Sequence, residues 1–343
     1  MTDVFQLLEG IGVERCMLFS EPSSGLRAIL VLDDITLGPA AGGVRTARYD
    51  SFSSALEDAF ALARAMTHKC ALAGLGAGGG KIVVLDHDDL DRGRAFEALG
   101  NHVESLEGLF RTSGDYGTTQ DDLRAMARRT RYVQSDEVRI AHAVAIGVLR
   151  SVEALQQFRG HAPRVEGLRI AIQGCGATGA AVARLFAEHG AELVVSDLVA
   201  ARAEGVAAET GADIIEPDDI LHAEVDIFAP CARGGWLDVE KVNELAARAV
   251  CGAANNVLTG IDAARRLQAR GILHVPDAIS SAGAVVEGIG RTVMGLPDRS
   301  PLLDHLGRTA LTVLRDARDK GITTHEAAEQ VAKERLEKAR ERA

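Results

Sequence analysis

The pattern of apolar and polar residues changes near residue 166. Before that point, short apolar runs such as 27–34 (RAILVLDD) and 81–86 (KIVVLD) predict strands, with amphipathic helical segments between them. After it, apolar runs alternate regularly with longer helical segments, which predicts a parallel, doubly wound sheet. The strands expected in this second half are 168–173, 192–197, 212–217, 224–231, 248–255 and 272–277, with helices over 177–189 and 198–209.

One helix of the first half is expected to lead to a lysine. Leu56, Phe60 and Ala63 recur on one face, and Ser54 followed by Glu57 has the form of a capping box. We therefore expect this helix to begin at the Ser54 box and to place Lys69 near its C-terminal end.

Length and pattern together predict two domains of an α/β protein. A chain of 343 residues is too long for one ordinary hydrophobic core. We expect an N-terminal α/β substrate-binding and oligomerisation domain over residues 1–143 and a Rossmann domain over 144–314, with a cleft between them. The charged segment after Pro301 predicts an exposed terminal helix. Helices from about 315 to 343 are expected to pack back on the first domain.

Composition narrows the class of partner. Aromatic residues make up 4% of the chain, so the cores must be mainly aliphatic. The net charge of −11 argues against nucleic acid and favours a small-molecule substrate. Five scattered cysteines without a CxxC pair indicate reduced thiols in a cytoplasmic protein, with no disulfide framework and no metal site. No apolar run is long enough to predict a membrane span or an export signal.

A glycine-rich motif follows the first strand of the second half. Gly174, Gly176 and Gly179 form GxGxxG between the apolar run 168–173 and an alanine-rich helix. In that context the glycines permit a tight turn, close approach of a pyrophosphate and close helix packing. We expect a dinucleotide to bind here, with Ala177 and Thr178 in the first helical turn.

The carboxyl ends of later strands supply further candidates for this site. Asp197 ends the second strand, where a carboxylate can bind both ribose hydroxyls and repel a 2′-phosphate, which favours NAD. The alternative is that Asp197 only caps the following helix. The expected walls around the ribose and nicotinamide are Cys231, Ala232, Ala254 and Asn256.

Two lysines flank a glycine-rich stretch in the first half. The stretch from Lys69 to Lys81 is not a phosphate-binding P-loop, because Leu75 and Ile82 stand where that motif needs Gly and Ser or Thr. A lysine in a cleft can hold a carboxylate as a fixed charge or, when desolvated, act as a base. The alternative is a pair of solvated surface lysines.

Asp115 lies in a Gly-flanked bend before Thr119, Asp121 and Asp122, which signal a helix start. The residues alone leave open whether Asp115 is a functional carboxylate or a turn residue.

Seven segments fall in the order and spacing of a known family. Together they resemble the glutamate/leucine/phenylalanine/valine dehydrogenases nearly end to end, and the pattern is most similar to the leucine-specific members. The segments are TLGPAAGGVR (36–45), ALEDAFALARAMTHK (55–69), AGLGAGGGK (73–81), SGDYGTTQDD (113–122), GCGATG (174–179), DIFAPCARGG (226–235) and PDAISSAG (276–283).

The resemblance implies a role for each motif residue. Lys69, with the backbone at Gly42 and Gly43, would bind the substrate α-carboxylate. Lys81 would be the catalytic base, and Asp115 would exchange protons with the amino nitrogen and water. The implied reaction converts NAD⁺, an L-amino acid and water to NADH, ammonium and a 2-oxo acid. The resemblance also implies a homo-oligomer, either a dimer or an octamer.

The chain departs from the family pattern at two places. The segment 132–155 is several residues shorter than usual and has Val144 near an expected cofactor-binding Thr, so either His142 substitutes or nicotinamide binding is weaker. Ser281 stands where the family has an Asn that contacts the substrate carboxylate.

Small residues in the expected side-chain pocket indicate the size of the substrate side chain. Ala41 stands where the leucine enzymes commonly have leucine, and Ser113 is a small neighbour. A smaller side chain enlarges the pocket, so we expect an apolar substrate larger than leucine, including an aromatic one.

Two other functions stay open: an oxidoreductase acting on a different amine or imine, and an inactive NAD-binding regulatory protein. Retention of Lys69, Lys81 and Asp115 favours an active enzyme.

Overall fold

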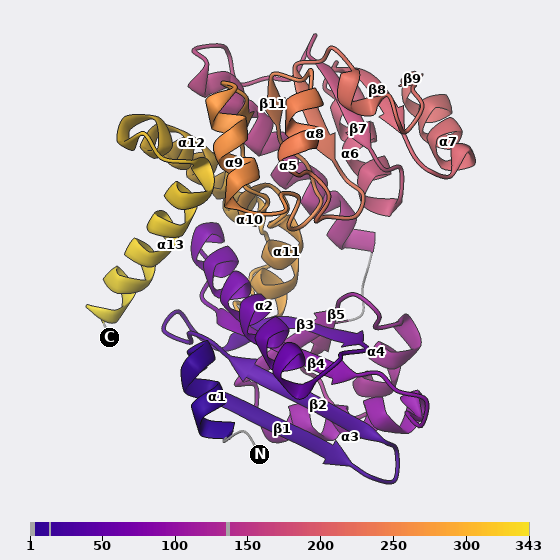
Figure 1. Ribbon diagram of the computed structural model, residues 1–343, viewed down its shortest axis with the longest axis vertical. Helices are drawn as coiled ribbons and strands as arrows, with labels where there is room; N and C mark the ends of the chain where they lie inside the picture. The colour runs from indigo at the N-terminus through magenta and orange to yellow at the C-terminus, as the bar shows by residue number, and fades with distance from the viewer. Residues whose placement is uncertain (1–3, 14, 135–137, 343) are drawn as a thin grey trace. The chain divides into compact units, whose positions relative to one another are not determined.

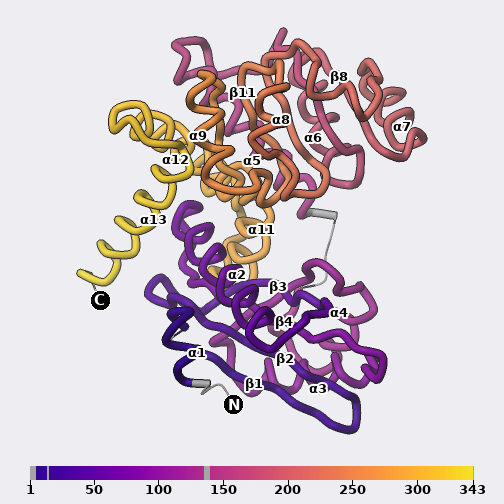
Figure 2. Tube along the Cα trace, in the orientation of Figure 1, coloured from indigo at the N-terminus to yellow at the C-terminus, as the bar shows by residue number. Residues whose placement is uncertain are grey.

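The computed structural model describes residues 4–13, 15–134 and 138–342. The chain forms two compact units: unit 1 comprises Met1–Asp136, Gly288–Leu296 and Arg335–Ala343, and unit 2 comprises Glu137–Glu287 and Pro297–Glu334. The first division follows Asp136, compared with residue 143 in the sequence-based assignment. Residues 315–334, assigned from sequence to the first domain, lie with unit 2. Figure 2 traces the chain through both units by colour.

Unit 1 is built on one mixed sheet. Among the described residues its strand order is β1-β2-β4-β3-β5-β6, with β2 antiparallel to β1 and β4 and the remaining neighbours parallel. The elements are α1 (Val4–Ile11), β1 (Arg15–Glu21), β2 (Leu26–Leu32), β3 (Ala40–Ala47), α2 (Phe52–Ala73), β4 (Gly78–Leu85), α3 (Arg92–Ser105), β5 (Phe110–Gly114), α4 (Gln120–Ala127) and β6 (Val133–Gln134).

Each face of this sheet has its own aliphatic core, as the alternation of strand side chains requires. On one face Val31 and Val83 pack against Leu56 and Ala59 of α2. On the other face, residues such as Ile82 join a cluster with Phe96 of α3 and Met126 of α4. Figure 1 shows α2 lying along the sheet. The sheet is therefore covered on both faces by buried side chains.

The expected glycine-rich turn is in large part a strand. Gly74 is the left-handed C-cap of α2, but Gly78, Gly79 and Gly80 belong to β4. A Cβ on Gly79 would collide with the Oγ1 of Thr67 and with α2 backbone, and one on Gly80 would meet the Phe110 ring. These glycines therefore serve close packing of helix and strand, a long-range requirement that the local sequence does not reveal.

Helix α2 begins earlier than expected. Its N-cap is Ser51, whose side chain accepts from the Ser54 backbone N–H, while the Ser54 hydroxyl accepts from the Ser51 N–H. The predicted Ser54-to-Glu57 box is therefore wrong, because the Ser54 side chain is itself the reciprocal member of the box. The end of α2 agrees with expectation, since Lys69 lies in its C-terminal part. The helix start before Asp122 is also confirmed, with Thr119 as N-cap.

Unit 2 contains the predicted doubly wound sheet. The strand order among the described residues is β12-β11-β10-β7-β8-β9, all parallel. Successive strands are added to one side of β7 up to β9 and to its other side from β10 onward. The boundary between β7 and β10 is therefore the switch point at which such sheets bind dinucleotides. The elements are α5 (Val138–Phe158), β7 (Arg169–Gln173), α6 (Ala177–Glu188), β8 (Glu192–Ser196), α7 (Ala200–Thr210), β9 (Asp213–Ile214), η1 (Ile220–His222), β10 (Ile227–Pro230), α8 (Val239–Glu244), β11 (Ala249–Val250), α9 (Ile261–Ala269), β12 (Leu273–His274), α10 (Asp277–Ser280) and α12 (Ser300–Lys320). Two further helices, α11 (Gly283–Thr292) and α13 (Thr324–Arg340), begin in unit 2 and end in unit 1.

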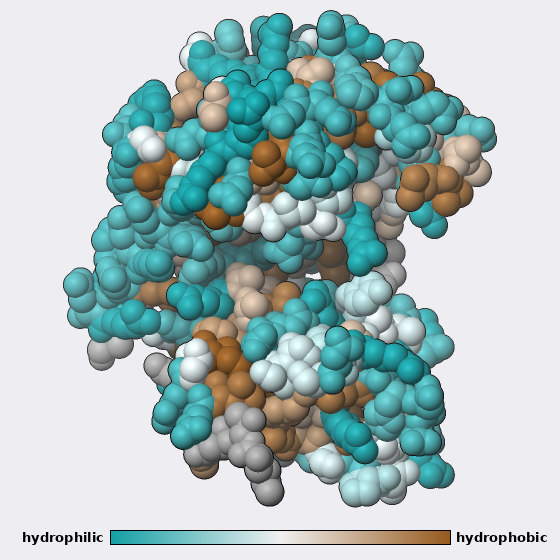
Figure 3. Space-filling model, in the orientation of Figure 1, coloured by the Kyte–Doolittle hydropathy of each residue, from teal (hydrophilic) through white to brown (hydrophobic). Residues whose placement is uncertain are grey.

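The terminal helix α13 is only partly exposed. Its Ala327, Ala332 and Leu336 are buried, although the charged residues around them predicted a solvent-exposed helix. These apolar residues are masked in the sequence by exposed Glu and Lys residues of the same helix, among them Lys333, Glu334 and Glu337. Figure 3 shows mainly hydrophilic surface where α13 lies in Figure 1. No helix within the described ranges is long and apolar enough to cross a membrane.

Candidate active site

The centre of the candidate site is an ion pair between two strands of unit 1. Lys81 lies within β4, and Asp115 follows the last residue of β5. The Lys81 Nζ donates to Asp115 Oδ2 at 2.7 Å. The Lys81 side chain is 7% exposed and that of Asp115 is 29% exposed. The structure therefore brings together the predicted base and the predicted proton-exchanging carboxylate, and Asp115 is more than a turn residue.

Burial and charge act differently on the two groups. Burial lowers the pKa of Lys81, because the low-dielectric surroundings disfavour its ammonium form, and Asp115 only partly offsets this effect. Burial alone would raise the pKa of Asp115, but the adjacent Lys81 and Arg45 cations outweigh it and lower that pKa. The site thus combines a firmly ionised carboxylate with a lysine that loses its proton more readily than an exposed one.

Several hydrogen bonds hold the segment that carries Asp115. The Thr118 hydroxyl donates to the Val44 carbonyl at 2.7 Å, and the Thr46 N–H donates to the Tyr116 carbonyl at 3.0 Å. A Cβ on Gly43 would lie 3.0 Å from the Asp115 Cβ, so glycine is needed where β3 passes the carboxylate. The position of Asp115 is therefore determined by β3 as well as by its own strand.

The register places other predicted residues on the same face as Lys81. Gly43 pairs with Ser113, and Ala41 pairs with Gly79, two residues before Lys81. Paired residues of parallel strands point to one side, and the Gly79 side faces α2. Gly42 points to the opposite face, where a Cβ would collide with the Gly80 carbonyl.

Lys69 belongs to α2, the helix that covers this face. It is half-buried and lies two residues after Thr67, the residue packed directly over Gly79 of β4. The Thr67 hydroxyl also donates to Asp33 Oδ2 at 2.6 Å, which ties α2 to the end of β2. The last turns of α2 are thus held firmly against the strand that carries Lys81.

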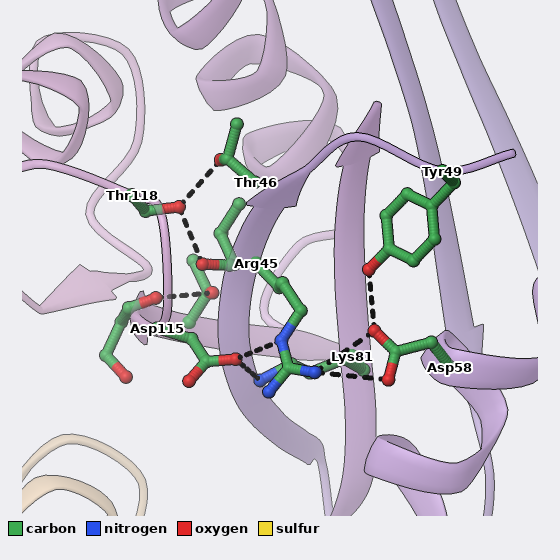
Figure 4. A network of polar contacts seen from close by, with 10 residues as sticks. Arg45, Thr46, Tyr49, Asp58, Lys81, Asp115 and Thr118 are labelled. Carbon is green, nitrogen blue, oxygen red and sulfur yellow. Dashed lines mark hydrogen bonds and ion pairs between the residues drawn. The ribbon is translucent and has the colours of Figure 1, made fainter. Parts of the chain in front are cut away.

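Sequence reasoning missed three residues that complete the polar network. Arg45 of β3 donates through Nε to Asp115 Oδ2 at 3.0 Å and through Nη1 to Asp58 of α2 at 3.1 Å. The Tyr49 hydroxyl donates to Asp58 Oδ2 at 2.6 Å. Figure 4 shows these side chains converging with Lys81. The sequence offered one signal for Arg45. It lies two residues after Gly43 in the same strand, so both residues are on the same face of the sheet.

The predicted dinucleotide loop of unit 2 has the required geometry. Gly174 follows β7 with φ +95°, a conformation that L side chains rarely adopt, and its Cβ would meet Ala232. A Cβ on Gly179 would collide with the Gly174 carbonyl, whereas the space around Gly176 is open. Gly176 is also the N-cap of α6 and has no side chain to occupy the helix N-terminus, where Ala177 and Thr178 begin the first turn.

Asp197 stabilises that loop. Its Oδ2 accepts from the Cys175 N–H at 2.7 Å, and its Oδ1 accepts from the Val199 N–H at 2.8 Å. Val199 is the N-cap of α7, so Asp197 lies two residues before the cap and is not itself the N-cap. Burial and the Asp197 carboxylate raise the pKa of Cys175 to about 11, so this thiol is neutral.

The remaining predicted residues of unit 2 lie in the loops after β10 and β11 and in α10. Cys231 and Ala232 follow Pro230, and the buried Ala254 donates from its backbone to the Pro230 carbonyl at 2.9 Å. Asn256 adopts φ +51° and donates from its backbone to Asp277 Oδ2 at 2.9 Å. The Ser281 hydroxyl, buried at the end of α10, lies 2.9 Å from Asn255 Oδ1 and 2.7 Å from the Asp277 carbonyl.

The shortened connection before α5 is described only in part. Residues 135–137 lie outside the described residues. Beyond them His142 is exposed and Val144 is buried in α5.

Comparison with known proteins decides the family. The profile of the Glu/Leu/Phe/Val dehydrogenase dimerisation domain matches residues 14–132, and that of the glutamate/leucine/phenylalanine/valine dehydrogenases matches residues 195–289. The chain is 33% identical over 339 residues to L-tryptophan dehydrogenase of Nostoc punctiforme, covering 97% of this chain and 96% of that protein. The chain belongs to the Glu/Leu/Phe/Val dehydrogenase family. It is an amino-acid dehydrogenase, an oxidoreductase acting on CH–NH₂ donors with an NAD(P) cofactor.

Other relatives of this amino-acid dehydrogenase have different substrate names. Leucine dehydrogenase of Thermoactinomyces intermedius is 33% identical, with 98% of this chain and 94% of that protein covered. Phenylalanine dehydrogenase of Lysinibacillus sphaericus is 35% identical, with 98% and 91% covered. The crystal structure of the Nostoc punctiforme L-tryptophan dehydrogenase superposes with a TM-score of 0.88, at 33% identity, over 98% of this chain and 99% of that one. The predicted fold and family are thereby confirmed.

Proposed function

We propose that this dehydrogenase catalyses the NAD-dependent, reversible oxidative deamination of an L-amino acid with a large apolar or aromatic side chain. The observation that carries the proposal is the buried Lys81–Asp115 pair at 2.7 Å. A structural surface salt bridge does not require a lysine this buried. A buried lysine whose proton is easily lost, next to a carboxylate that stays ionised, is suited to acid–base work.

Each residue near the pair has a proposed task. Lys69 holds the α-carboxylate of the substrate as a fixed cation, together with the backbone of Gly42 and Gly43. Neutral Lys81 takes a proton from the water that attacks the oxidised Cα of the substrate. Asp115 exchanges protons between the substrate nitrogen and water. Bound NAD supplies the acceptor for the hydride that leaves Cα.

Unit 2 fits the dinucleotide by its backbone shape. The open space at Gly176 admits a pyrophosphate to the α6 N-terminus, and its N–H groups there attract anions. We propose that Asp197 binds the ribose hydroxyls and disfavours NADP, since its carboxylate lies at the end of β8 beside the loop. Cys231, Ala232, Ala254 and Asn256 would line the ribose and nicotinamide region. Ser281 would act near the substrate carboxylate in place of the family's asparagine.

The substrate class follows from small residues on the Lys81 face. Ala41 and Ser113 leave more room there than leucine at the first position would leave. A tryptophan dehydrogenase and a phenylalanine dehydrogenase among the relatives support a large side chain, and the leucine dehydrogenases support an apolar one. We place the substrate among the aromatic and bulky aliphatic amino acids.

We also propose that unit 1 mediates a homo-oligomer, a dimer or an octamer. The family profile that matches residues 14–132 describes a dimerisation domain. Phe5 of α1 and Leu18 of β1 are 73% and 58% exposed, so apolar side chains are available on the face that carries these elements. Light scattering of the purified protein measures this assembly directly.

The activity test uses the full chain with NAD⁺ and a panel of leucine, valine, phenylalanine and tryptophan at alkaline pH. We expect NADH absorbance at 340 nm, a higher kcat/KM for the bulky substrates, and loss of turnover in Lys81→Ala. Lys320→Ala, an exposed lysine of α12, is the matched control. A preference for valine would contradict the proposed pocket. Cofactor binding without turnover on any amine would instead support an inactive regulatory protein, and turnover only on other amines would support the second alternative.

A further inference from the structure

One carboxylate oxygen at the site serves two cations. Asp115 Oδ2 accepts from Lys81 Nζ at 2.7 Å and from Arg45 Nε at 3.0 Å. The two donors come from neighbouring parallel strands, and both side chains are largely screened from solvent. Lysine loses its proton when it acts as a base, whereas the guanidinium of arginine stays charged throughout the usable pH range. The two cations therefore cannot have the same function.

Arg45 is itself held in place from its other side. Its Nη1 lies 3.1 Å from both oxygens of Asp58, and the Tyr49 hydroxyl donates to one of those oxygens at 2.6 Å. Figure 4 shows the guanidinium between the two carboxylates, with the Tyr49 hydroxyl on Asp58. Charge-assisted hydrogen bonds to two carboxylates restrain the guanidinium in this position when the charge on a neighbour changes.

The permanent cation matters at the moment when Lys81 is neutral. A carboxylate as buried as Asp115 is costly to keep ionised without a partner, and it would then tend to take up a proton. With Arg45 still donating to the same oxygen, Asp115 remains ionised and stays in position. Arg45 also shares the negative charge that would otherwise hold the proton on Lys81.

We propose that Arg45 is a positioning residue that keeps Asp115 ionised and oriented while Lys81 is neutral. Arg45 favours the neutral form of Lys81 and Asp58 favours its ammonium form, so these two residues adjust in opposite directions the pH at which Lys81 becomes a base. This inference rests on the proposed role of Lys81. In this role Arg45 and Asp58 act through Asp115 and Lys81 and need no contact with the substrate.

Arg45 and Asp58 have opposite effects on the pKa of Lys81. Burial lowers the Lys81 pKa most, Asp115 raises it, Arg45 lowers it further and Asp58 raises it. The titratable and charged groups in and beside this network come from β3, from α2 and from the segments after β2, β3 and β5: Arg45 from β3, Tyr49 after β3, Asp58 from α2, Asp33 after β2, and Asp115 after β5. Helix α2 also carries Lys69.

The test compares pH profiles of kcat/KM for oxidative deamination. Activity rises with pH as Lys81 loses its proton. Arg45→Gln removes the cation that lowers the Lys81 pKa, so we expect the rising limb to move up by about 1 pH unit. Asp58→Asn removes an anion that raises it, so the limb is expected to move down. A purely structural role would lower the plateau in both variants without moving the limbs in opposite directions.

Two further variants serve as controls. Arg45→Lys keeps the charge, so its limb is expected to lie nearer to wild type than that of Arg45→Gln. Arg48→Gln changes an exposed arginine three residues along the chain, and we expect no shift. If Arg45→Gln does not fold, the proposal still requires the rising limb of Asp58→Asn to move to lower pH. Limbs that stay in place, or that move in the same direction in Arg45→Gln and Asp58→Asn, would overturn the proposal.

A direct titration separates this inference from the proposed function. Competitive acetylation of the free protein, followed by mass spectrometry of the Lys81 peptide, reports the pKa of that amine without turnover. We expect the same opposite shifts in Arg45→Gln and Asp58→Asn. If Lys81→Ala retains activity, the proposed function of Lys81 as the base is contradicted. If Lys81→Ala is inactive but the Lys81 pKa is unchanged in Arg45→Gln and Asp58→Asn, only the proposed role of Arg45 and Asp58 is contradicted.

Discussion

Thr67 of α2 lies directly over Gly79 of β4, so close that any Cβ on the glycine would collide with the threonine hydroxyl. This contact joins the helix that carries Lys69 to the strand that carries Lys81. It explains why the chain has glycines in a strand, where they are ordinarily unfavourable.

Gly79→Ala is therefore expected to be severely destabilising. The added methyl group must displace α2 backbone or β4, and overpacking of this kind costs roughly 1–3 kcal/mol or more. Gly205→Ala is the matched control, because nothing lies near its Cβ and it is within helix α7. It should stabilise the fold by about 0.5–1 kcal/mol. Thermal melting monitored by circular dichroism compares the two, and equal melting temperatures would contradict the packing argument.

Asp115→Asn leaves Lys81 without its ionised partner. A buried ammonium in that state is expected to destabilise the protein by about 3 kcal/mol near neutral pH, the low end for a broken buried pair, because Asp115 is partly exposed. The folded-state pKa of Lys81 is below its ordinary value, so raising the pH through it removes the unpaired charge and restores stability.

We therefore expect the gap in melting temperature between Asp115→Asn and wild type to narrow from pH 7 to pH 10. Asp121→Asn, at an exposed aspartate of α4, is the control and should show a small gap at both values. A gap that is independent of pH would mean that Lys81 does not titrate in this range.

Ala41→Leu tests the side-chain pocket. The larger residue fills space on the Lys81 face, so kcat/KM for tryptophan should fall relative to that for leucine. A change of this size in an apolar pocket is worth about 1–3 kcal/mol, or roughly 10- to 200-fold in selectivity. Steady-state kinetics with both amino acids measures the ratio. An equal loss for both substrates would place Ala41 outside the pocket.

Asp197→Ser tests the choice of cofactor. Loss of hydrogen bonds from a charged acceptor should lower kcat/KM with NAD⁺ about 10- to 100-fold, and loss of the negative charge should raise the relative use of NADP⁺. The control is Asp213→Asn, an exposed aspartate at the start of β9. Kinetics with both cofactors give the ratio, and an unchanged ratio would leave Asp197 with only its loop-stabilising bonds to Cys175 and Val199.

The sequence by itself determined the features that depend on neighbours along the chain. The period of the apolar runs determined the parallel sheet of unit 2, and the spacing of Gly174, Gly176 and Gly179 determined the loop after β7, because strand pleat, left-handed φ and helix start are local properties. Thr119 and Asp122 likewise marked the start of α4 correctly. Lys81 and Asp115 stood out as candidates in the sequence, but their catalytic roles rested largely on the family resemblance, since 34 residues separate them.

Only the tertiary structure decided how distant residues combine. Arg45 meets an aspartate 70 residues away and another 13 residues away, and no local pattern encodes either contact. The choice of Ser51 over Ser54 as N-cap and the burial of Leu336 in a charged helix also depended on packing. The physical reason is the same in each case: charge and steric fit act through space, so a side chain's partner is set when strands and helices meet.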